Sequence, residues 1–261
     1  MELGLSGKTA LVVASSQGLG KAIARQLVLE GANVMITSRN EEKLQEVEKE
    51  LRDLHKGQVA HVQADITKVE DIRHLVQKTV DTYGTIDLLV NNAGGPPAGT
   101  FETISDEDWY HAFELNLLSY IRMIREALPY LKKKGGKIVN IASSSIKEPI
   151  PGLLLSNTFR TGIVGLTKTL AVEFAPYNIL INTVAPGRIA TERVAFLDKI
   201  NAEKLGISKE EMEARMKSAI PLGRYGTPEE FANVVTFLLS EANSYITGQS
   251  LIVDGGMVKA I

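Results

Sequence analysis

Short apolar runs that alternate with longer amphipathic stretches are the feature that most constrains the fold of this chain. Seven runs are rich in Val, Ile and Leu, at residues 9–14, 33–38, 58–63, 88–91, 137–141, 180–184 and 250–253. Such runs are typical of parallel strands that are buried on both faces. Helical periodicity fills the gaps, at residues 20–30, 41–54, 69–83, 105–131, 156–174 and 228–239. The alternation predicts repeated β-α-β units, and therefore an α/β fold with a doubly wound parallel sheet of about seven strands flanked by helices.

The chain shows no division into separate parts. No internal repeat, low-complexity tract or linker interrupts it, so we expect a single domain over residues 1–261. The one long departure from the alternation is residues 188–226. This helical insertion lies just past a strand's C-terminal end, which is the edge where open α/β sheets bind ligands. A lid that covers a substrate and a solvated helical excursion are both open interpretations of this segment.

The composition excludes several classes of protein. The formal net charge is −2 and the Lys and Arg residues are scattered among acids, so we expect no nucleic-acid partner. The absence of cysteine excludes disulfides, a thiolate nucleophile and Cys-ligated zinc, and we expect no metal site. Residues 1–8 lack the pattern of a signal peptide, and no apolar run approaches the roughly 20 residues of a membrane span. We therefore expect a soluble, cytoplasmic protein without a membrane partner.

The turn between the first predicted strand and the first predicted helix carries two glycines, Gly18 and Gly20. In a β-α-β unit, the pyrophosphate of a dinucleotide meets backbone N–H groups and the helix dipole at this place, and glycines permit the close approach. A Gly-x-Gly pair alone is weak evidence because a tight turn selects the same residues, but its position strengthens it. The residues predicted to bind a cofactor here are Ala14, Ser16, Gln17, Gly18, Leu19 and Gly20.

Ser38 and Arg39 end the second predicted strand, and no acid stands beside them. In a dinucleotide fold an acid at this place bonds the 2′-hydroxyl of the adenosine ribose, whereas an arginine pairs with a 2′-phosphate. The sequence therefore favours NADP(H), with NAD(H) as the alternative cofactor. Another interpretation is that Arg39 is a solvated residue that opens the next helix.

The turn resembles that of the short-chain dehydrogenase/reductase family, which has a Rossmann-type fold and carries Thr-Gly-x-x-x-Gly-x-Gly here. Gly18 and Gly20 match, but Val13 and Ala14 stand where the family has Thr and Gly. Val13 lacks a hydroxyl that can tie the turn to a neighbouring strand. Ala14 adds a Cβ, which would narrow the pocket or weaken binding.

The resemblance runs from about residue 5 to the C-terminus, through five motifs in the family's order. It implies that Asp65 and Ile66 flank the adenine and that the Asn-Asn-Ala-Gly segment at residues 91–94 lines the cofactor cleft. It also implies that Ile189 and Thr191 contact the nicotinamide carboxamide. The cofactor-binding residues that the resemblance adds are Asp65, Ile66, Asn92, Ala93, Gly94, Pro186, Gly187, Ile189 and Thr191.

The same family supplies an expectation for catalysis. Its Tyr exchanges the proton, a Lys four residues later holds the ribose, a Ser thirteen residues before the Tyr polarises the carbonyl, and an Asn completes a water relay. The resemblance places the relay at Asn116 and the carbonyl contact at Ser143, although Ser144 and Ser145 are close neighbours of the latter. Asn116 could instead be a helix-internal amide with a core hydrogen bond.

Ser156 and Arg160 occupy the positions of the family's Tyr and Lys. Position 156 lies thirteen residues after Ser143, and the family-like segment 165–171 sets the same register. Arg160 can fork toward both ribose hydroxyls, so the resemblance also implies a cofactor contact for it. A serine hydroxyl, in contrast, is a very poor acid, and matched proton transfer is typically worth about 10²–10⁴-fold. As a hypothesis, Ser143 and a water held by Ser156 and Asn116 protonate the carbonyl slowly.

Three functions remain to be weighed. We favour an NADP(H)-dependent oxidoreductase that acts on a 3-oxoacyl compound or a small ketone, or oxidises the alcohol, with atypical proton delivery. A catalytically silent homologue that acts as a nucleotide-binding scaffold or sensor is the alternative, and non-redox chemistry is the third. The apolar run at residues 149–155 could floor a pocket for an acyl substrate or could be plain packing. The resemblance also implies a homotetramer.

Overall fold

The computed structural model describes residues 2–260, so Met1 and Ile261 of the expected domain lie outside the described residues. Within these, seven parallel strands form one sheet in the order β3-β2-β1-β4-β5-β6-β7. The predicted single-domain, doubly wound α/β fold is therefore confirmed. The strands are β1 (Thr9–Val12), β2 (Asn33–Ser38), β3 (Val59–Gln63), β4 (Leu88–Asn91), β5 (Gly136–Ile141), β6 (Ile179–Pro186) and β7 (Ser250–Val253).

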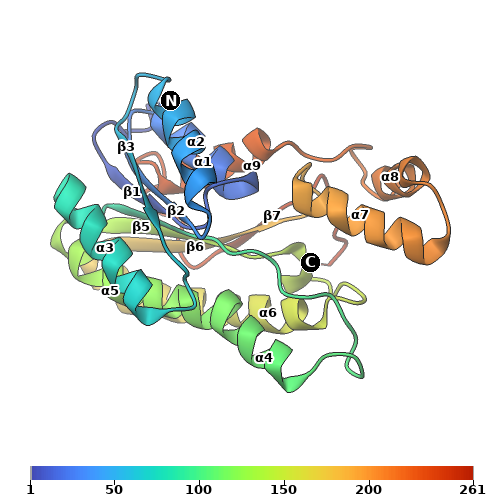
Figure 1. Cartoon of the computed structure of the whole chain (residues 1–261). Helices are drawn as coiled ribbons and strands as arrows, with labels where there is room; N and C mark the ends of the chain where they lie inside the picture. The colour runs from blue at the N-terminus through green and yellow to red at the C-terminus, as the bar shows by residue number, and fades with distance from the viewer. Residues whose placement is uncertain (1, 261) are drawn as a thin grey trace.

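Helices cover both faces of the sheet, as Figure 1 shows. Buried side chains of α1, α2 and α9 form a core on one face, and those of α3, α5 and α6 form a second core on the other. No helix among the described residues is long and apolar enough to cross a membrane. The α-helices are α1 (Gly18–Leu29), α2 (Glu41–Arg52), α3 (Val69–Tyr83), α4 (Asp106–Phe113), α5 (Ser119–Lys134), α6 (Leu154–Phe174), α7 (Glu192–Leu205), α8 (Lys209–Ser218) and α9 (Pro228–Leu239).

Strand β1 shows why the strands are apolar throughout. Val12 packs into the core beneath α1 and α9, whereas its neighbour Leu11 packs into the core beneath α3 and α5. Successive side chains of a strand point to opposite faces of the sheet. A strand that is covered by helices on both sides therefore needs apolar residues at successive positions.

The strand order reverses at β1, because the chain first builds β2 and β3 on one side of β1 and then adds β4 to β7 on the other. Ligands of open α/β sheets bind outside the carboxyl ends of the strands at such a switch point. The segments that follow β1 to β6 meet at this edge, and they include most of the predicted site residues.

The helix predicted over residues 105–131 is interrupted. A π-helical segment, Glu114–Leu118, separates α4 from α5 and holds Asn116 at its centre. Such a segment adds one residue to a turn, so it changes which side chains face the sheet, and π-bulges occur frequently at functional sites. Hydrophobic periodicity did not reveal this interruption, because helical spacing continues on both sides of it, in α4 and in α5.

The predicted insertion at residues 188–226 contains two helices, α7 and α8. Figure 1 shows them extending beyond the layered part of the molecule, on the side of the sheet's carboxyl edge. Thr191 caps the start of α7 by accepting a hydrogen bond from Val194 N, and Ser208 caps α8 by accepting one from Glu211 N. The first turn of α7 lies at the switch-point edge, because Thr191 and the three residues after it line a cleft there.

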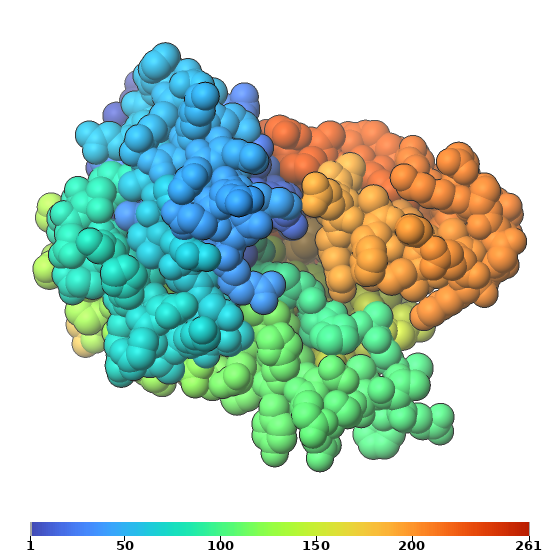
Figure 2. Space-filling view, viewed as in Figure 1, coloured from blue at the N-terminus to red at the C-terminus, as the bar shows by residue number. Residues whose placement is uncertain are grey.

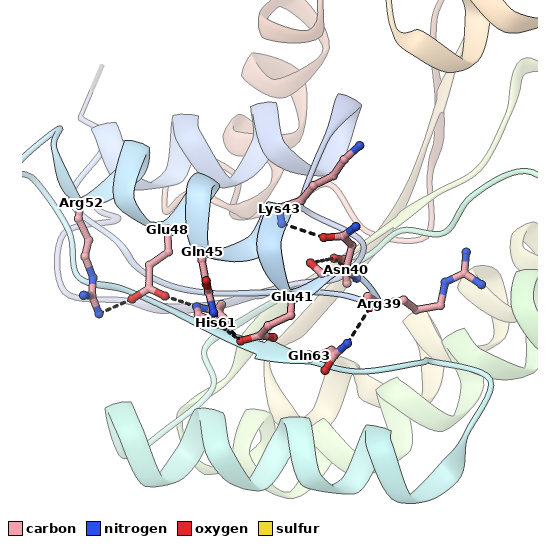
Figure 3. Close-up of polar contacts among 10 residues, drawn as sticks. Arg39, Asn40, Glu41, Lys43, Gln45, Glu48, Arg52, His61 and Gln63 are labelled. Carbon is pink, nitrogen blue, oxygen red and sulfur yellow. Dashed lines mark hydrogen bonds and ion pairs between the residues drawn. The ribbon is translucent and has the colours of Figure 1, made fainter.

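A second polar cluster ties β3 to α2. His61 of β3 lies between the carboxylates of Glu41 and Glu48, and Arg52 pairs with Glu48, as Figure 3 shows. The distance from His61 Nε2 to Glu41 Oε1 is 2.8 Å. Burial disfavours the charged imidazole, but the hydrogen bonds to the two carboxylates outweigh it and raise the pKa of His61.

This cluster predicts a pH-dependent stability. Because the pKa of His61 is higher in the folded than in the unfolded chain, its stabilisation is fully present below the unfolded value of about 6.5 and is lost as the pH rises through the folded pKa. Urea unfolding should therefore show that His61→Gln costs more stability in mild acid than in mild alkali. The matched variant His74→Gln, on the exposed face of α3, should show no such trend. A cost for His61→Gln that is independent of pH would contradict the assignment.

Candidate functional site

A cleft of about 650 Å³ opens at the carboxyl edge of the sheet. Figure 2 shows the surface hollowed between the blue N-terminal segments and the orange segment of α7 and α8. Most of the predicted site residues line it, and the exceptions are Gly20, Asn116, Ser156 and Arg160. The predicted residues that line the cleft are Ala14, Ser16, Gln17, Gly18, Leu19, Ser38, Arg39, Asp65, Ile66, Asn92, Ala93, Gly94, Ser143, Pro186, Gly187, Ile189 and Thr191.

Gly20 lies behind the cleft rather than on its wall. A Cβ at this position would lie 2.3 Å from Ala14 O and 2.9 Å from Asn92 Nδ2. Asn92 in turn donates a hydrogen bond from Nδ2 to Ala14 O, at 3.1 Å. Gly20 is therefore required so that α1 can approach the turn, and it shapes the cleft without lining it.

The turn after β1 is tied to β2 by Ser15, which the sequence analysis missed. Ser15 N donates to Thr37 O at 2.9 Å, and Ser15 Oγ accepts from Thr37 N at 3.0 Å. Val13 is buried in the core beside β1, so the hydroxyl that it lacks is replaced by that of Ser15. Ala14 adopts a φ of +51°, which is a conformation that favours glycine.

Two cations face the cleft where β2 ends. Arg39 lines it, and so does Lys43, which the sequence analysis missed and which donates from Nζ to Gln17 Oε1 at 2.8 Å. Asn40 caps α2 by accepting from Lys43 N, which fixes the first turn of the helix beside Arg39. In Figure 3 the Arg39 side chain extends away from the cluster around His61.

Asp65 also lines the cleft, and its carboxylate interacts with the charge of Arg39. Burial disfavours its carboxylate, but hydrogen bonds from Thr67, together with the charges of Arg39 and Lys68, outweigh burial and lower its pKa. Thr67 donates to Asp65 Oδ1 from both N and Oγ1, at 3.0 and 2.8 Å. Asp65 is therefore an ionised, fixed acceptor on the wall of the cleft.

Ser143 alone of the three consecutive serines lines the cleft. It follows the end of β5, and its Oγ accepts a hydrogen bond from Ser145 N at 3.2 Å. Ser144 and Ser145 are buried at 3 % exposure and do not belong to the lining. Of the three serines, Ser143 is therefore the one that a ligand in the cleft could contact.

Asn116 is fully buried and reaches the cleft only through its neighbour Gly94. Its Nδ2 donates to Gly94 O at 2.7 Å, whereas its Oδ1 has no hydrogen-bond partner among the described residues. Asn116 is therefore a core amide that fixes one residue of the cleft wall. The residue before it, Leu115, does line the cleft.

The structure does not place Arg160 on the cleft, which differs from the expected ribose contact. Its guanidinium donates to Ile141 O at 2.8 Å from Nη1 and to Ala93 O at 3.1 Å from Nη2. Nη1 also donates to Tyr120 Oη at 2.7 Å. Arg160 is only 4 % exposed, because α6 turns this position toward the sheet. Its long forked side chain therefore binds main-chain oxygens at the ends of β4 and β5.

Tyr120 completes this buried cluster and was missed by the sequence analysis. Its hydroxyl donates to Ile141 O at 2.8 Å and its side chain is 1 % exposed. Burial raises the pKa of Tyr120, and the charge of Arg160 only partly counters it. Tyr120 is therefore a neutral phenol outside the cleft, and it does not replace the family's catalytic Tyr.

Ser156 stands at the start of α6 and is half-buried, outside the cleft lining. The next residue, Asn157, bonds both the N–H and the C=O of Ile150, at 3.2 and 3.0 Å. The apolar run at residues 149–155 packs against the segment after β4, where Gly99 N donates to Gly152 O at 2.7 Å. This run does not line the cleft, so the cleft gives no support to the acyl-pocket interpretation, and of the run only Leu155 is buried.

The first turn of α7 contributes further lining residues that the sequence analysis missed. Thr191, which was predicted, lines the cleft, and so do the next three residues, Glu192, Arg193 and Val194. Gly95 and His111 also line the cleft. The predicted insertion therefore forms one wall of the cleft.

Comparison with known proteins agrees with this architecture. Residues 13–258 match the family model described as Enoyl-(Acyl carrier protein) reductase. The 3-oxoacyl-[acyl-carrier-protein] reductase FabG of Aquifex aeolicus is 38% identical, over 98% of this chain and 100% of that protein. The NADPH-dependent reductase BacG of Bacillus subtilis is 34% identical, over 98% of this chain and 100% of that protein. The L-sorbose reductase of Gluconobacter frateurii, solved with NADPH and L-sorbose, superimposes at a TM-score of 0.95 with 31% identity and 100% of both chains covered.

The fold and the cleft define a doubly wound α/β protein with its ligand site at the switch point of the sheet. The matches span nearly the whole chain, and the chain belongs to the short-chain dehydrogenase/reductase family of oxidoreductases. The resemblance that the motifs predicted is confirmed at this level.

The position of Arg160 predicts a large effect on stability. Arg160→Met would leave Ala93 O without this donor and remove a charged donor from Ile141 O, so we expect the free energy of unfolding to fall by about 2–4 kcal/mol. Arg125→Met, on the exposed face of α5, is the matched control and should change stability by less than about 0.5 kcal/mol. Urea unfolding in the absence of nucleotide measures both. Equal, small effects would refute the structural role of Arg160.

Proposed function

We propose that the protein is an NADP(H)-dependent oxidoreductase that moves a hydride between the nicotinamide and a carbonyl carbon, reducing a 3-oxoacyl compound or small ketone or oxidising the alcohol. The observation that carries this proposal is the cleft itself, which runs from Arg39 and Lys43 at the end of β2 to Ser143 at the end of β5. A dinucleotide fits such a cleft with its adenosine at the cationic end and its nicotinamide at the serine end. Relatives named as reductases that use NADPH support the same function.

The preference for NADP(H) rests on the two cations at the end of β2. An acid at this place would bind a free 2′-hydroxyl, whereas Arg39 and Lys43 can both donate to a 2′-phosphate. The lining contains no acid from β2 or from the first turn of α2 among the described residues. NAD(H) is the weaker alternative.

Proton delivery in this proposal differs from that of the family. The hydroxyl of Ser143 donates a hydrogen bond to the carbonyl oxygen of the substrate. Water within the open cleft then supplies the proton slowly. Ser156 and Arg160 lie outside the cleft, so neither takes the role of the family's Tyr or Lys. The part given to Ser156 in the sequence-based hypothesis is therefore dropped, and Asn116 retains only the positioning of Gly94.

The placement of Ser156 and Arg160 also favours the second candidate function, a catalytically silent scaffold or sensor that binds a nucleotide in this cleft. Such a protein would retain the cationic end at Arg39 and would not need an acid near Ser143. Binding of NADPH without turnover distinguishes it from the oxidoreductase.

Three further proposals concern the setting of the site. Residues 188–226 act as a lid, because the first turn of α7 forms one wall of the cleft.

The protein is a homotetramer. Exposed apolar side chains on α4 and α6, including Tyr110, Phe113 and Val172, support this oligomeric state, and light scattering tests it. It works in the cytoplasm, where its small-molecule substrate and NADP(H) are present, and fractionation of cells tests that location.

The cofactor proposal predicts the effect of removing both cations. In Arg39→Gln/Lys43→Gln, the dissociation constant of NADPH should rise about 10- to 100-fold, because two charge-assisted contacts to the 2′-phosphate are lost. The dissociation constant of NADH should stay unchanged. Lys49→Gln, farther along α2 and outside the lining, is the control. Nicotinamide fluorescence measures both nucleotides, and equal weakening of NADPH and NADH would contradict the assignment.

The catalytic proposal predicts turnover that depends on Ser143. With NADPH and a panel of ketones and acyl thioesters, Ser143→Ala should lower kcat about 10²-fold, since it removes a donor to the developing oxyanion. Ser156→Ala should leave kcat unchanged, because Ser156 lies outside the cleft. Absorbance at the NADPH band measures the rate. If NADPH binds but the protein turns over none of these compounds, the oxidoreductase proposal is wrong and the scaffold function is favoured.

A further inference from the structure

The first turn of α7 carries a cation into the cleft that has no acidic partner among the described residues. Arg193 lines the cleft, and its one hydrogen bond runs from Nη2 to Pro96 O at 3.2 Å. A guanidinium has five N–H donors, so most of them remain available. Glu192 also lines the cleft, but its carboxylate forms no ion pair with Arg193 within the described part of the chain.

The strand order places this guanidinium near the proposed reacting centre. Arg193 follows β6 and Pro96 follows β4, while β5 lies between these two strands. The contact from Arg193 to Pro96 therefore bridges the carboxyl end of β5, which Ser143 follows. Thr191, in contrast, lies beside the turn after β1, since its Cγ2 would be 3.9 Å from a Cβ on Gly18. Arg193 thus belongs to the Ser143 end of the cleft.

Holding Arg193 here has electrostatic costs that no acid among the described residues offsets. The ring of Phe196, whose centre lies 5.9 Å from the guanidinium carbon, offsets them only in part. Burial lowers the pKa of Arg193, and no carboxylate counters that desolvation. A cation in the first turn of a helix also faces the positive end of the helix dipole. In addition, the guanidinium lies against Gly95, where a Cβ would be 3.2 Å from Nη2 and 3.5 Å from Nε. The glycine leaves room for Arg193, although its backbone does not adopt a left-handed φ.

We propose that Arg193 binds an anionic oxygen group of the substrate, a carboxylate or a phosphate, so that the protein acts on a carbonyl compound that bears a negative charge. The proposal rests on the proposed function, and it names the substrate class. Two oxygens of such a group match the forked guanidinium. With the anion on Arg193 and the carbonyl oxygen on Ser143, the substrate is held at two points, which fixes its orientation toward the nicotinamide.

The phosphates of the cofactor are a second source of the same chemistry, so the experiment measures both. Levulinate and acetoacetate are compared with their methyl esters as ligands of the full chain, by the ligand concentration dependence of the melting temperature, with NADP⁺ and without it. The dissociation constant of NADPH is measured in parallel by fluorescence. The variants are Arg193→Gln and, as a control on the same insertion but outside the lining, Arg215→Gln, which removes a cation paired with Glu211.

We expect each acid to bind at least about tenfold more tightly than its ester, and Arg193→Gln to abolish that difference while leaving the NADPH constant unchanged. Arg215→Gln should retain the difference. Equal binding of acid and ester by the unaltered protein would overturn the proposal. So would weaker NADPH binding in Arg193→Gln with the acid preference intact, because Arg193 would then serve the cofactor. If NADPH does not bind at all, the proposed function fails, and the acid and ester measured without nucleotide still decide whether Arg193 binds an anion.

Discussion

The buried guanidinium of Arg160 is the interaction on which the arrangement of this cleft depends. It joins Ala93 O, just past the end of β4, to Ile141 O, the last residue of β5, and Tyr120 supports it from the opposite helix. These strand ends carry Gly94 and Ser143 into the cleft. Taking a charged group out of water costs several kcal/mol, and hydrogen bonds to carbonyl dipoles must offset that cost.

This use of Arg160 changes what the rest of the site must do. In the family pattern the residue at this position holds the ribose, but here its donors are bound behind the cleft wall. In the proposed function, cofactor affinity then comes from the turn after β1 and from Arg39 and Lys43. In the proposed function, Ser143 and Arg193, which both line the cleft, are left at the nicotinamide end.

Much of the architecture could be predicted from the sequence, because parallel strands that are buried on both faces appear in it as continuous apolar runs. Part of the cleft lining followed from position, since residues after the strands of a doubly wound sheet meet at one edge, and the rest followed from the family resemblance. The direction of Arg160 could not be predicted, because a register fixes which residue occupies a helix position but not where a long side chain reaches. The π-helical segment at Asn116 and the wall formed by Arg193 depend on tertiary packing, which periodicity does not report.

The same limit explains why Lys43 and Ser15 were missed. Lys43 reaches the cleft only because Asn40 caps α2 at that place, and Ser15 matters only because β2 lies beside the turn. Neither has a distinctive sequence signal. In both cases the function of a residue is set by the neighbour that the fold brings to it.

The most direct test of this account is a crystal structure of the protein with NADP⁺ bound. The account predicts that the guanidinium of Arg160 keeps its hydrogen bonds to Ala93 O and Ile141 O, while the nucleotide lies in the cleft with its 2′-phosphate between Arg39 and Lys43. A structure in which Arg160 has turned away from both carbonyls to bind the ribose hydroxyls would contradict it.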